Sequence, residues 1–154
     1  LKDMLDFALV NSKLMLEQGC KGFFIMAEGS QIDWEGHDND FKGLYVEIEE
    51  FENAVTSALA FAMNRQDTLV IVTADHETGG LLIEKDTLRY KETNQMKVSW
   101  NTAVGKGDHT GSMVPIFAYG PGSENFTGIL DNTDIFFAMQ EAIGINDLPD
   151  GSCY

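Results

Sequence analysis

The sequence predicts an α/β fold in which a mostly parallel sheet is flanked by helices, organised as a single domain over residues 1–154. Between residues 45 and 63, apolar side chains recur every three to four positions, which is the spacing of a long amphipathic helix. Residues 68–74 (TLVIVTA) form a continuous apolar run, typical of a parallel strand covered on both faces. Helices and strands also follow one another along the chain, as the α/β class requires.

The remaining elements are predicted from shorter patterns. Helical spacing of apolar residues, with a glycine just after each segment, predicts two more helices, over residues 2–18 and 134–143. For the second, Asn132 or Thr133 is the expected amino-terminal cap and Gly144 the expected end. Short apolar or alternating runs predict four more strands, at residues 22–26, 81–84, 96–100 and 114–119. Residues 30–43 are polar and acidic, so a loop is expected there.

The charge balance excludes some classes of partner. The chain has 10 lysines and arginines against 25 acidic residues, a formal net charge of −15. Binding to a nucleic-acid backbone or to an anionic membrane surface needs the opposite sign, so we expect neither partner. The apolar runs have the length of strands rather than of membrane helices, so no membrane span is expected. The two cysteines, Cys20 and Cys153, allow at most one disulfide and fit no metal-binding spacing.

The three histidines of the chain each lie beside a carboxylate in a polar segment that contains glycine: His37, His76 and His109. Catalytic zinc sites use nitrogen and oxygen donors of this kind and leave one position open. Asp33 and His37 are four residues apart, which places both side chains on one side of a helical turn, where they could share a cation. An isolated acidic stretch or a simple turn is the alternative interpretation of each segment. The recurrence of histidine and acid together favours a metal site.

Two acidic groups lie where predicted strands end. Asp75 and His76 follow the run at residues 68–74, and Glu28 follows the run at residues 22–26. Ligands of open α/β sheets gather at the carboxyl ends of the strands, so we expect these groups to belong to one site. Glu77, Asp38 and Asp108 adjoin the candidate ligands and are interpreted as supporting or solvated groups.

Three segments together carry a family resemblance: EGSQID with His37, VTADHETGG at residues 72–80, and DHTG at residues 108–111 followed by Val114 and Pro115. In this order they resemble the carboxyl-terminal half of alkaline phosphatases, from about residue 1 to about residue 145. The resemblance implies a partial alkaline-phosphatase-like fold. It also implies a first zinc held by Asp33, His37 and His109, a second zinc held by Asp75 and His76, and a magnesium held by Glu28.

The activity implied by the resemblance is hydrolysis of phosphate monoesters, with release of inorganic phosphate, through a phosphoserine intermediate. The cofactors implied are two Zn²⁺ and one Mg²⁺ per complete site. The family also implies a homodimer in the periplasm or outside the cell. A related phosphodiesterase, phosphomutase or sulfatase remains an alternative, and so does a zinc-binding module without catalysis.

Parts of the family pattern are absent from this sequence. No serine follows Asp and precedes Ala, the context of the family's nucleophile, and Arg65 and Arg89 both lie in segments typical of surface charge. The chain also begins without methionine. We therefore expect a missing amino-terminal half to supply the nucleophile and the phosphate-binding arginine, and the chain alone to be inactive. Trp34 stands where some relatives have a basic residue, and its role is open.

Overall fold

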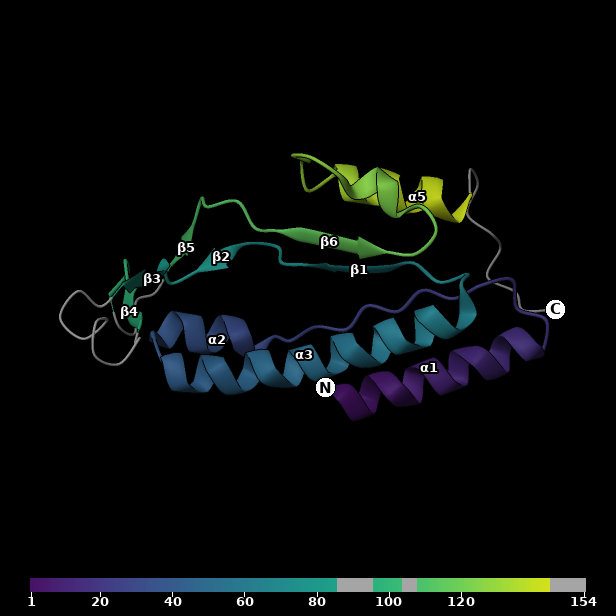
Figure 1. The fold of residues 1–154 in the computed structure, drawn as a ribbon, viewed down its shortest axis with the longest axis horizontal. Coiled ribbons are helices and arrows are strands. Elements are labelled where there is room, and N and C mark those ends of the chain that lie inside the picture. The colour runs from purple at the N-terminus through teal and green to yellow at the C-terminus, as the bar shows by residue number, and fades with distance from the viewer. Residues whose placement is uncertain (86–95, 104–107, 145–154) are drawn as a thin grey trace. The chain divides into compact units, whose positions relative to one another are not determined.

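The computed structural model describes residues 1–85, 96–103 and 108–144, coloured along the chain in Figure 1. Helices and strands follow one another along the chain, as the sequence predicts. The helices are α1 (Lys2–Glu17), α2 (Gln31–Asp38), α3 (Phe41–Arg65), the short 3-10 helix η1 (Ser123–Phe126) and α5 (Asp134–Ile143). The strands are β1 (Val70–Thr73), β2 (Glu77–Thr78), β3 (Leu81–Lys85), β4 (Met96–Trp100), β5 (His109–Thr110) and β6 (Ile116–Tyr119).

The chain divides into two compact units. The first contains residues 1–28, 50–75 and 115–154, and the second contains residues 29–49 and 76–114. Each unit combines segments that are distant in the sequence. The organisation of residues 1–154 as a single domain remains a prediction.

The core of the first unit is the contact between α1 and α3, which lie alongside each other in Figure 1. Leu5 and Leu9 of α1 pack against Ala54 of α3, and Ala58 and Phe61 border the same cluster. Both helices were predicted from the spacing of their apolar residues. That spacing places Leu5 and Leu9 on one face of α1, because residues four apart are neighbours on a helix surface.

The strand pairs of the described residues are antiparallel, unlike the mostly parallel sheet expected from the sequence. In the first unit, β1 pairs with β6 in a register that sets Val70 opposite Tyr119 and Thr73 opposite Ile116. The apolar run in β1 correctly predicts a strand. However, such a run reflects coverage of both faces of a strand, which is typical of parallel sheets but does not fix the direction of the neighbouring strand.

Residues 22–26, expected to be a buried strand, pair with no other strand among the described residues. Their side chains nevertheless alternate as in a strand, with Phe23 and Ile25 half-buried and Phe24 and Met26 exposed. Ile25 packs against the α1–α3 cluster. One apolar face of this segment is therefore covered, and the other faces outward.

In the second unit, α2 occupies part of the segment that was expected to be a loop. Its polar and acidic residues hide the helical period, and Gly36, a poor helix former, lies within it and is buried. The helix ends at Asn39, which adopts the left-handed conformation with φ 54°.

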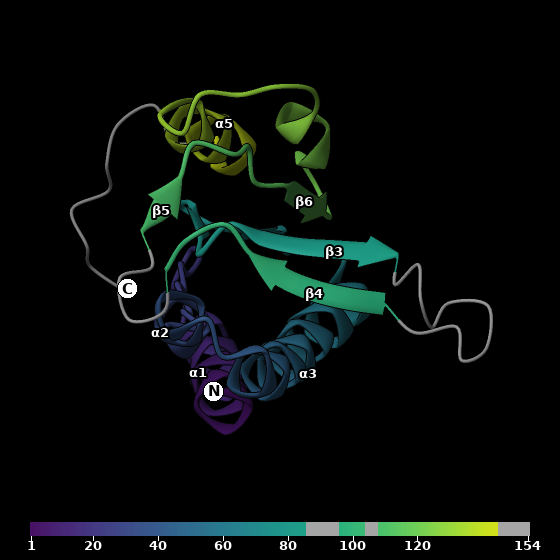
Figure 2. The same cartoon turned by 90° about the vertical axis from the view of Figure 1, so that its left-hand side faces the viewer.

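Two short antiparallel pairs complete the second unit. β2 pairs with β5, so that Glu77 lies opposite Thr110 and Thr78 lies opposite His109. β3 pairs with β4, seen as two antiparallel arrows in Figure 2. Gly79 and Gly80, both with positive φ, connect β2 to β3. β3 then pairs with β4.

The last helix, α5, has the predicted bounds, and Gly144 ends it in the left-handed conformation with φ 71°. Thr133 occupies the amino-terminal cap position, but its side chain makes no capping hydrogen bond to the helix. It donates instead to Asp131 Oδ1, which also accepts the Thr133 N–H. Cys20 is disulfide-bonded, and Cys153 lies outside the described residues. Among the helices described, none has both the length and the apolar character of a membrane span.

Candidate metal centre

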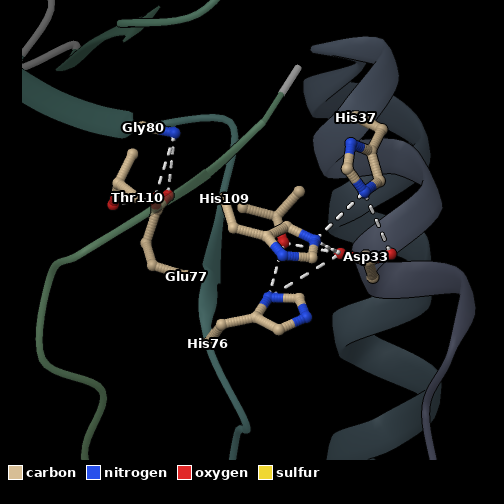
Figure 3. Close-up of polar contacts among 8 residues, drawn as sticks. Asp33, His37, His76, Glu77, Gly80, His109 and Thr110 are labelled. Atoms are coloured by element: carbon tan, nitrogen blue, oxygen red, sulfur yellow. Dashed lines mark hydrogen bonds and ion pairs between the residues drawn. The ribbon is translucent and has the colours of Figure 1, made fainter. Parts of the chain in front are cut away.

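The second unit brings together three of the predicted zinc ligands, Asp33, His37 and His109. Asp33 and His37 lie one turn apart on α2, and His109 comes from β5 (Figure 3). One donor atom from each residue lies within 4.8 Å of the other two. The helix thus supplies two donors from one face, and the β2–β5 pairing supplies the third from 72 residues further along the chain.

The distances between donor atoms fit a tetrahedral zinc site. The Nε2 atoms of His37 and His109 are 3.2 Å apart, His37 Nε2 is 3.3 Å from Asp33 Oδ2, and His109 Nε2 is 3.4 Å from Asp33 Oδ1. Ligands at zinc bond lengths of about 2.0–2.1 Å define tetrahedral edges of about 3.3 Å. Three protein donors leave one position for a substrate or water, as in catalytic zinc sites. The side chain of His109 is 45% exposed, so this donor is accessible from solvent.

His76 adjoins the same cluster. Its ring stacks on that of His109, with centroids 3.4 Å apart and an interplanar angle of 20°, and its Nδ1 lies 4.0 Å from Asp33 Oδ1. Figure 3 shows all three histidine rings grouped around the Asp33 carboxylate. His76 thus lies next to the proposed first zinc site, as expected of a ligand to a neighbouring ion.

Thr78 connects Asp33 and His76, and the sequence analysis did not identify it. Its hydroxyl donates to Asp33 Oδ1 over 2.6 Å and lies 3.1 Å from His76 Nδ1. Thr78 lies within the VTADHETGG segment, which carries the family resemblance but indicates no role for this residue. A threonine next to a turn carries no signal of such a contact, because the contact depends on where α2 lies.

The environment of Asp33 favours its ionised form. Burial raises the pKa of the Asp33 carboxyl, but the hydrogen bond from Thr78 and the nearby His37, His109 and His76 lower it, and the pKa lies below its usual value. A carboxylate must be deprotonated to bind a metal, so the site holds Asp33 in its ligating form.

Glu77 has a structural role, because its carboxylate accepts hydrogen bonds from the protein. Its carboxylate accepts the N–H groups of Gly80, at 2.9 Å and 3.2 Å, and of Leu81, at 3.1 Å. It also accepts a short hydrogen bond from the Thr110 hydroxyl (Figure 3). His76 precedes Glu77, and His109 precedes Thr110. The hydrogen bond between Thr110 and Glu77 therefore joins the two segments that carry these histidines.

The remaining predicted ligands, Asp75 and Glu28, belong to the first unit. Both are exposed, and each directly precedes a segment of the second unit. Their assignment to the second zinc and to magnesium remains a prediction. Asp38 and Asp108 are also exposed, as expected of solvated groups.

Comparison with known proteins identifies the family. The family model for alkaline phosphatase matches residues 1–97 and 83–145. Alkaline phosphatase 3 of Bacillus subtilis is 33% identical over an alignment that covers 96% of this chain and 46% of the relative. The alkaline phosphatase of Escherichia coli is 37% identical, with 85% of this chain and 30% of the relative covered. The chain thus spans less than half the length of these relatives.

Solved structures agree with this identification. A mutant of the alkaline phosphatase from the Antarctic bacterium TAB5, solved with magnesium bound in its M3 site, has a TM-score of 0.71 and 41% sequence identity. The match covers 81% of this chain and 37% of that one. It confirms the expected partial alkaline-phosphatase-like fold. The sequence, the fold and the solved structures all show that this chain belongs to the alkaline phosphatase family.

Proposed function

We propose that the chain is the carboxyl-terminal, metal-binding part of a zinc- and magnesium-dependent alkaline phosphatase that hydrolyses phosphate monoesters through a phosphoserine intermediate. The observation that carries this proposal is the meeting of Asp33, His37 and His109, with one donor atom of each within 4.8 Å of the others. Family membership adds that the cluster lies in a chain related to phosphoric monoester hydrolases.

Different residues of the chain bind the different metal ions. Asp33, His37 and His109 would hold the first zinc, and three protein donors would leave one position for substrate or water. His76 and Asp75 contribute to the second zinc, and Glu28 contributes to magnesium. The magnesium in the M3 site of the TAB5 mutant supports a magnesium requirement in this family. The bound ions would supply the positive charge that stabilises the attacking and leaving oxygens of the phosphoryl group.

Charge explains why such a chain needs metal ions near its substrate. The chain carries a net charge of −15, which repels a dianionic phosphate monoester. A carboxylate and two imidazoles concentrate divalent cations at one place and reverse the sign of the local field. The Asp33 carboxylate, ionised by its surroundings, keeps this site available for a cation.

The rest of the active site comes from the missing amino-terminal half of the same protein. That half supplies the nucleophilic serine and the phosphate-binding arginine, so the chain alone does not turn over a monoester. The complete protein is proposed to be a homodimer located in the periplasm or outside the cell, as the family resemblance implies.

Reconstitution with the amino-terminal half tests the proposed function. The two halves would be co-expressed and assayed with p-nitrophenyl phosphate, bis-p-nitrophenyl phosphate and p-nitrophenyl sulfate in the presence of zinc and magnesium. We expect turnover of the monoester, lost on chelation and in the His109→Ala variant. Preference for the diester or the sulfate ester would indicate a different superfamily activity. Hydrolysis by the chain alone would refute the proposal that the amino-terminal half supplies the nucleophile and the phosphate-binding arginine.

A further inference from the structure

Thr78 lies between a proposed ligand of the first zinc and a proposed ligand of the second. Its hydroxyl oxygen is 2.6 Å from Asp33 Oδ1 and 3.1 Å from His76 Nδ1. In the β2–β5 pairing it also lies directly opposite His109. A single half-buried side chain therefore contacts both the carboxylate and one of the imidazoles of the site.

The direction of these hydrogen bonds follows from what each group can donate. An ionised carboxylate only accepts hydrogen bonds, so the single proton of the Thr78 hydroxyl is committed to Asp33. The same hydroxyl oxygen can then only accept from His76, which requires a proton on His76 Nδ1. In a neutral imidazole with Nδ1 protonated, Nε2 carries the lone pair that can bind a metal.

We propose that Thr78 is a positioning residue that fixes the His76 tautomer with the proton on Nδ1 and orients Asp33 Oδ1 at the same time. His76 then presents Nε2 as its metal-binding atom. This proposal rests on the proposed function in assigning a metal to His76, but the tautomer itself is a property of the protein without metal. The role is one of orientation, since the hydroxyl contacts ligands rather than substrate.

The packing around Thr78 holds the hydroxyl in place. Gly36 on α2 is buried, and a Cβ added there would lie 3.0 Å from Thr78 Cγ2 and 3.1 Å from Thr78 Cβ. The absence of a side chain at Gly36 lets β2 approach the helix at the turn that separates Asp33 from His37. Threonine is branched at Cβ and has few favoured χ1 angles, so a close wall on one side restricts the direction of its hydroxyl.

Three variants separate the hydroxyl from the volume of the side chain. Thr78→Val removes the hydroxyl and keeps the shape, and Thr78→Ser restores the hydroxyl without the methyl group. Thr102→Val is the matched control, because Thr102 is also half-buried in the second unit. Its hydroxyl donates to the Gly79 carbonyl over 2.9 Å and lies 3.3 Å from Asn39 Oδ1, and neither Gly79 nor Asn39 is a proposed ligand.

The first readout is the tautomer of His76 in the metal-free chain, measured by ¹⁵N NMR of the imidazole rings at about pH 8.5, where a free imidazole is neutral. We expect the Nδ1-protonated form to dominate in the wild type, in Thr78→Ser and in Thr102→Val. In Thr78→Val we expect a mixture of both tautomers. An unchanged tautomer in Thr78→Val, or an Nε2-protonated His76 in the wild type, would overturn the proposal.

The second readout is the dissociation constant for zinc alone, titrated into the same four proteins. Loss of a partner that orients a ligand weakens metal affinity by about 10- to 100-fold, so we expect this loss in Thr78→Val and recovery in Thr78→Ser. Equal affinities in all four proteins would contradict the positioning role. Failure of the wild type to bind zinc would count against the proposed function instead, while the tautomer measurement would still decide the role of Thr78.

Discussion

The Nε2 atoms of His37 and His109 lie 3.2 Å apart, although 72 residues separate them in the chain. Two imidazole nitrogens at this distance need a proton or a cation between them, because their lone pairs otherwise repel each other. Asp33 lies within 3.4 Å of both nitrogens and adds negative charge. The arrangement is therefore suited to hold a cation, and it depends on how closely α2 and the β2–β5 pair approach.

A substitution at Gly36 tests how far zinc binding depends on the close approach of α2 to the β2–β5 pair. A Cβ at this position would meet Thr78 Cγ2 at 3.0 Å and the Thr78 carbonyl oxygen at 3.4 Å, so Gly36→Ala should push β2 from the helix. We expect zinc affinity to fall about tenfold, the lower end of the effect of disturbed ligand support. The usual gain of about 1 kcal/mol for alanine over glycine in a helix should be absent. Zinc titration and urea unfolding measure both quantities.

Gly43→Ala is the matched control on α3. The three atoms nearest to its added Cβ all belong to the flexible side chain of Glu35, which can rotate away. We expect this variant to gain up to about 1 kcal/mol in stability and to bind zinc as the wild type does. If Gly36→Ala gained as much stability and kept its zinc affinity, the close contact with Thr78 would have no importance.

Glu77 should hold the turn that follows His76. Replacing it with alanine leaves three donors without their acceptor, the N–H groups of Gly80 and Leu81 and the hydroxyl of Thr110. We expect a loss of about 1–3 kcal/mol in unfolding free energy, the cost of unsatisfied polar groups. Glu77→Gln, which keeps one acceptor oxygen, should lose less. Hydrogen exchange of the Gly80 and Leu81 amides should accelerate in Glu77→Ala, and unchanged exchange would contradict this role.

Acid should weaken the contact between Arg65 and Asp67 after α3. The hydrogen bonds from the Arg65 guanidinium hold the pKa of the Asp67 carboxyl below its usual 3.8. Because the folded pKa is the lower one, the unfolded chain binds more protons below about pH 5, and the stabilisation is lost as pH falls through the folded pKa. Asp67 is exposed and Arg65 is half-buried, so solvent screens the pair and its contribution is below about 1 kcal/mol.

The corresponding measurement compares the melting temperatures of the wild type and Asp67→Asn from pH 7 to pH 2. The wild type should be slightly more stable at neutral pH, and the difference should vanish in acid. In an Arg65→Gln background, Asp67→Asn should show a smaller pH dependence, because the hydrogen bond from the Thr68 hydroxyl to Asp67 remains. A difference that grows as the pH falls would have the wrong sign for this contact.

Local sequence patterns predicted the isolated elements well and their pairing poorly. The bounds of β4 and α5 agree with the prediction, because alternation in one and apolar spacing in the other depend only on the element itself. The direction of β6 next to β1 depends on how the chain returns from the second unit, which no local pattern records. The helix α2 was missed because its polar and acidic residues give no regular apolar face.

In the candidate site, too, features of single residues were predictable from the sequence and contacts between segments were not. Asp33, His37 and His109 could be predicted as candidate ligands because the chain has only three histidines, each beside an aspartate, and both residue types have well-defined metal chemistry. Thr78 was assigned no role and Glu77 only a supporting or solvated one, since a hydroxyl or carboxylate beside a turn acquires its function only from the tertiary contacts. Ligands are thus easier to predict than the residues that orient them.

Zinc content tests the central claim most directly. The chain would be dialysed against trace zinc and analysed for zinc per chain beside His109→Ala and the control Asp38→Asn, which changes an exposed acid next to His37. We predict about one zinc in the wild type and in Asp38→Asn, and its loss in His109→Ala without unfolding. Full zinc occupancy in His109→Ala would contradict the assignment of Asp33, His37 and His109 as one metal site.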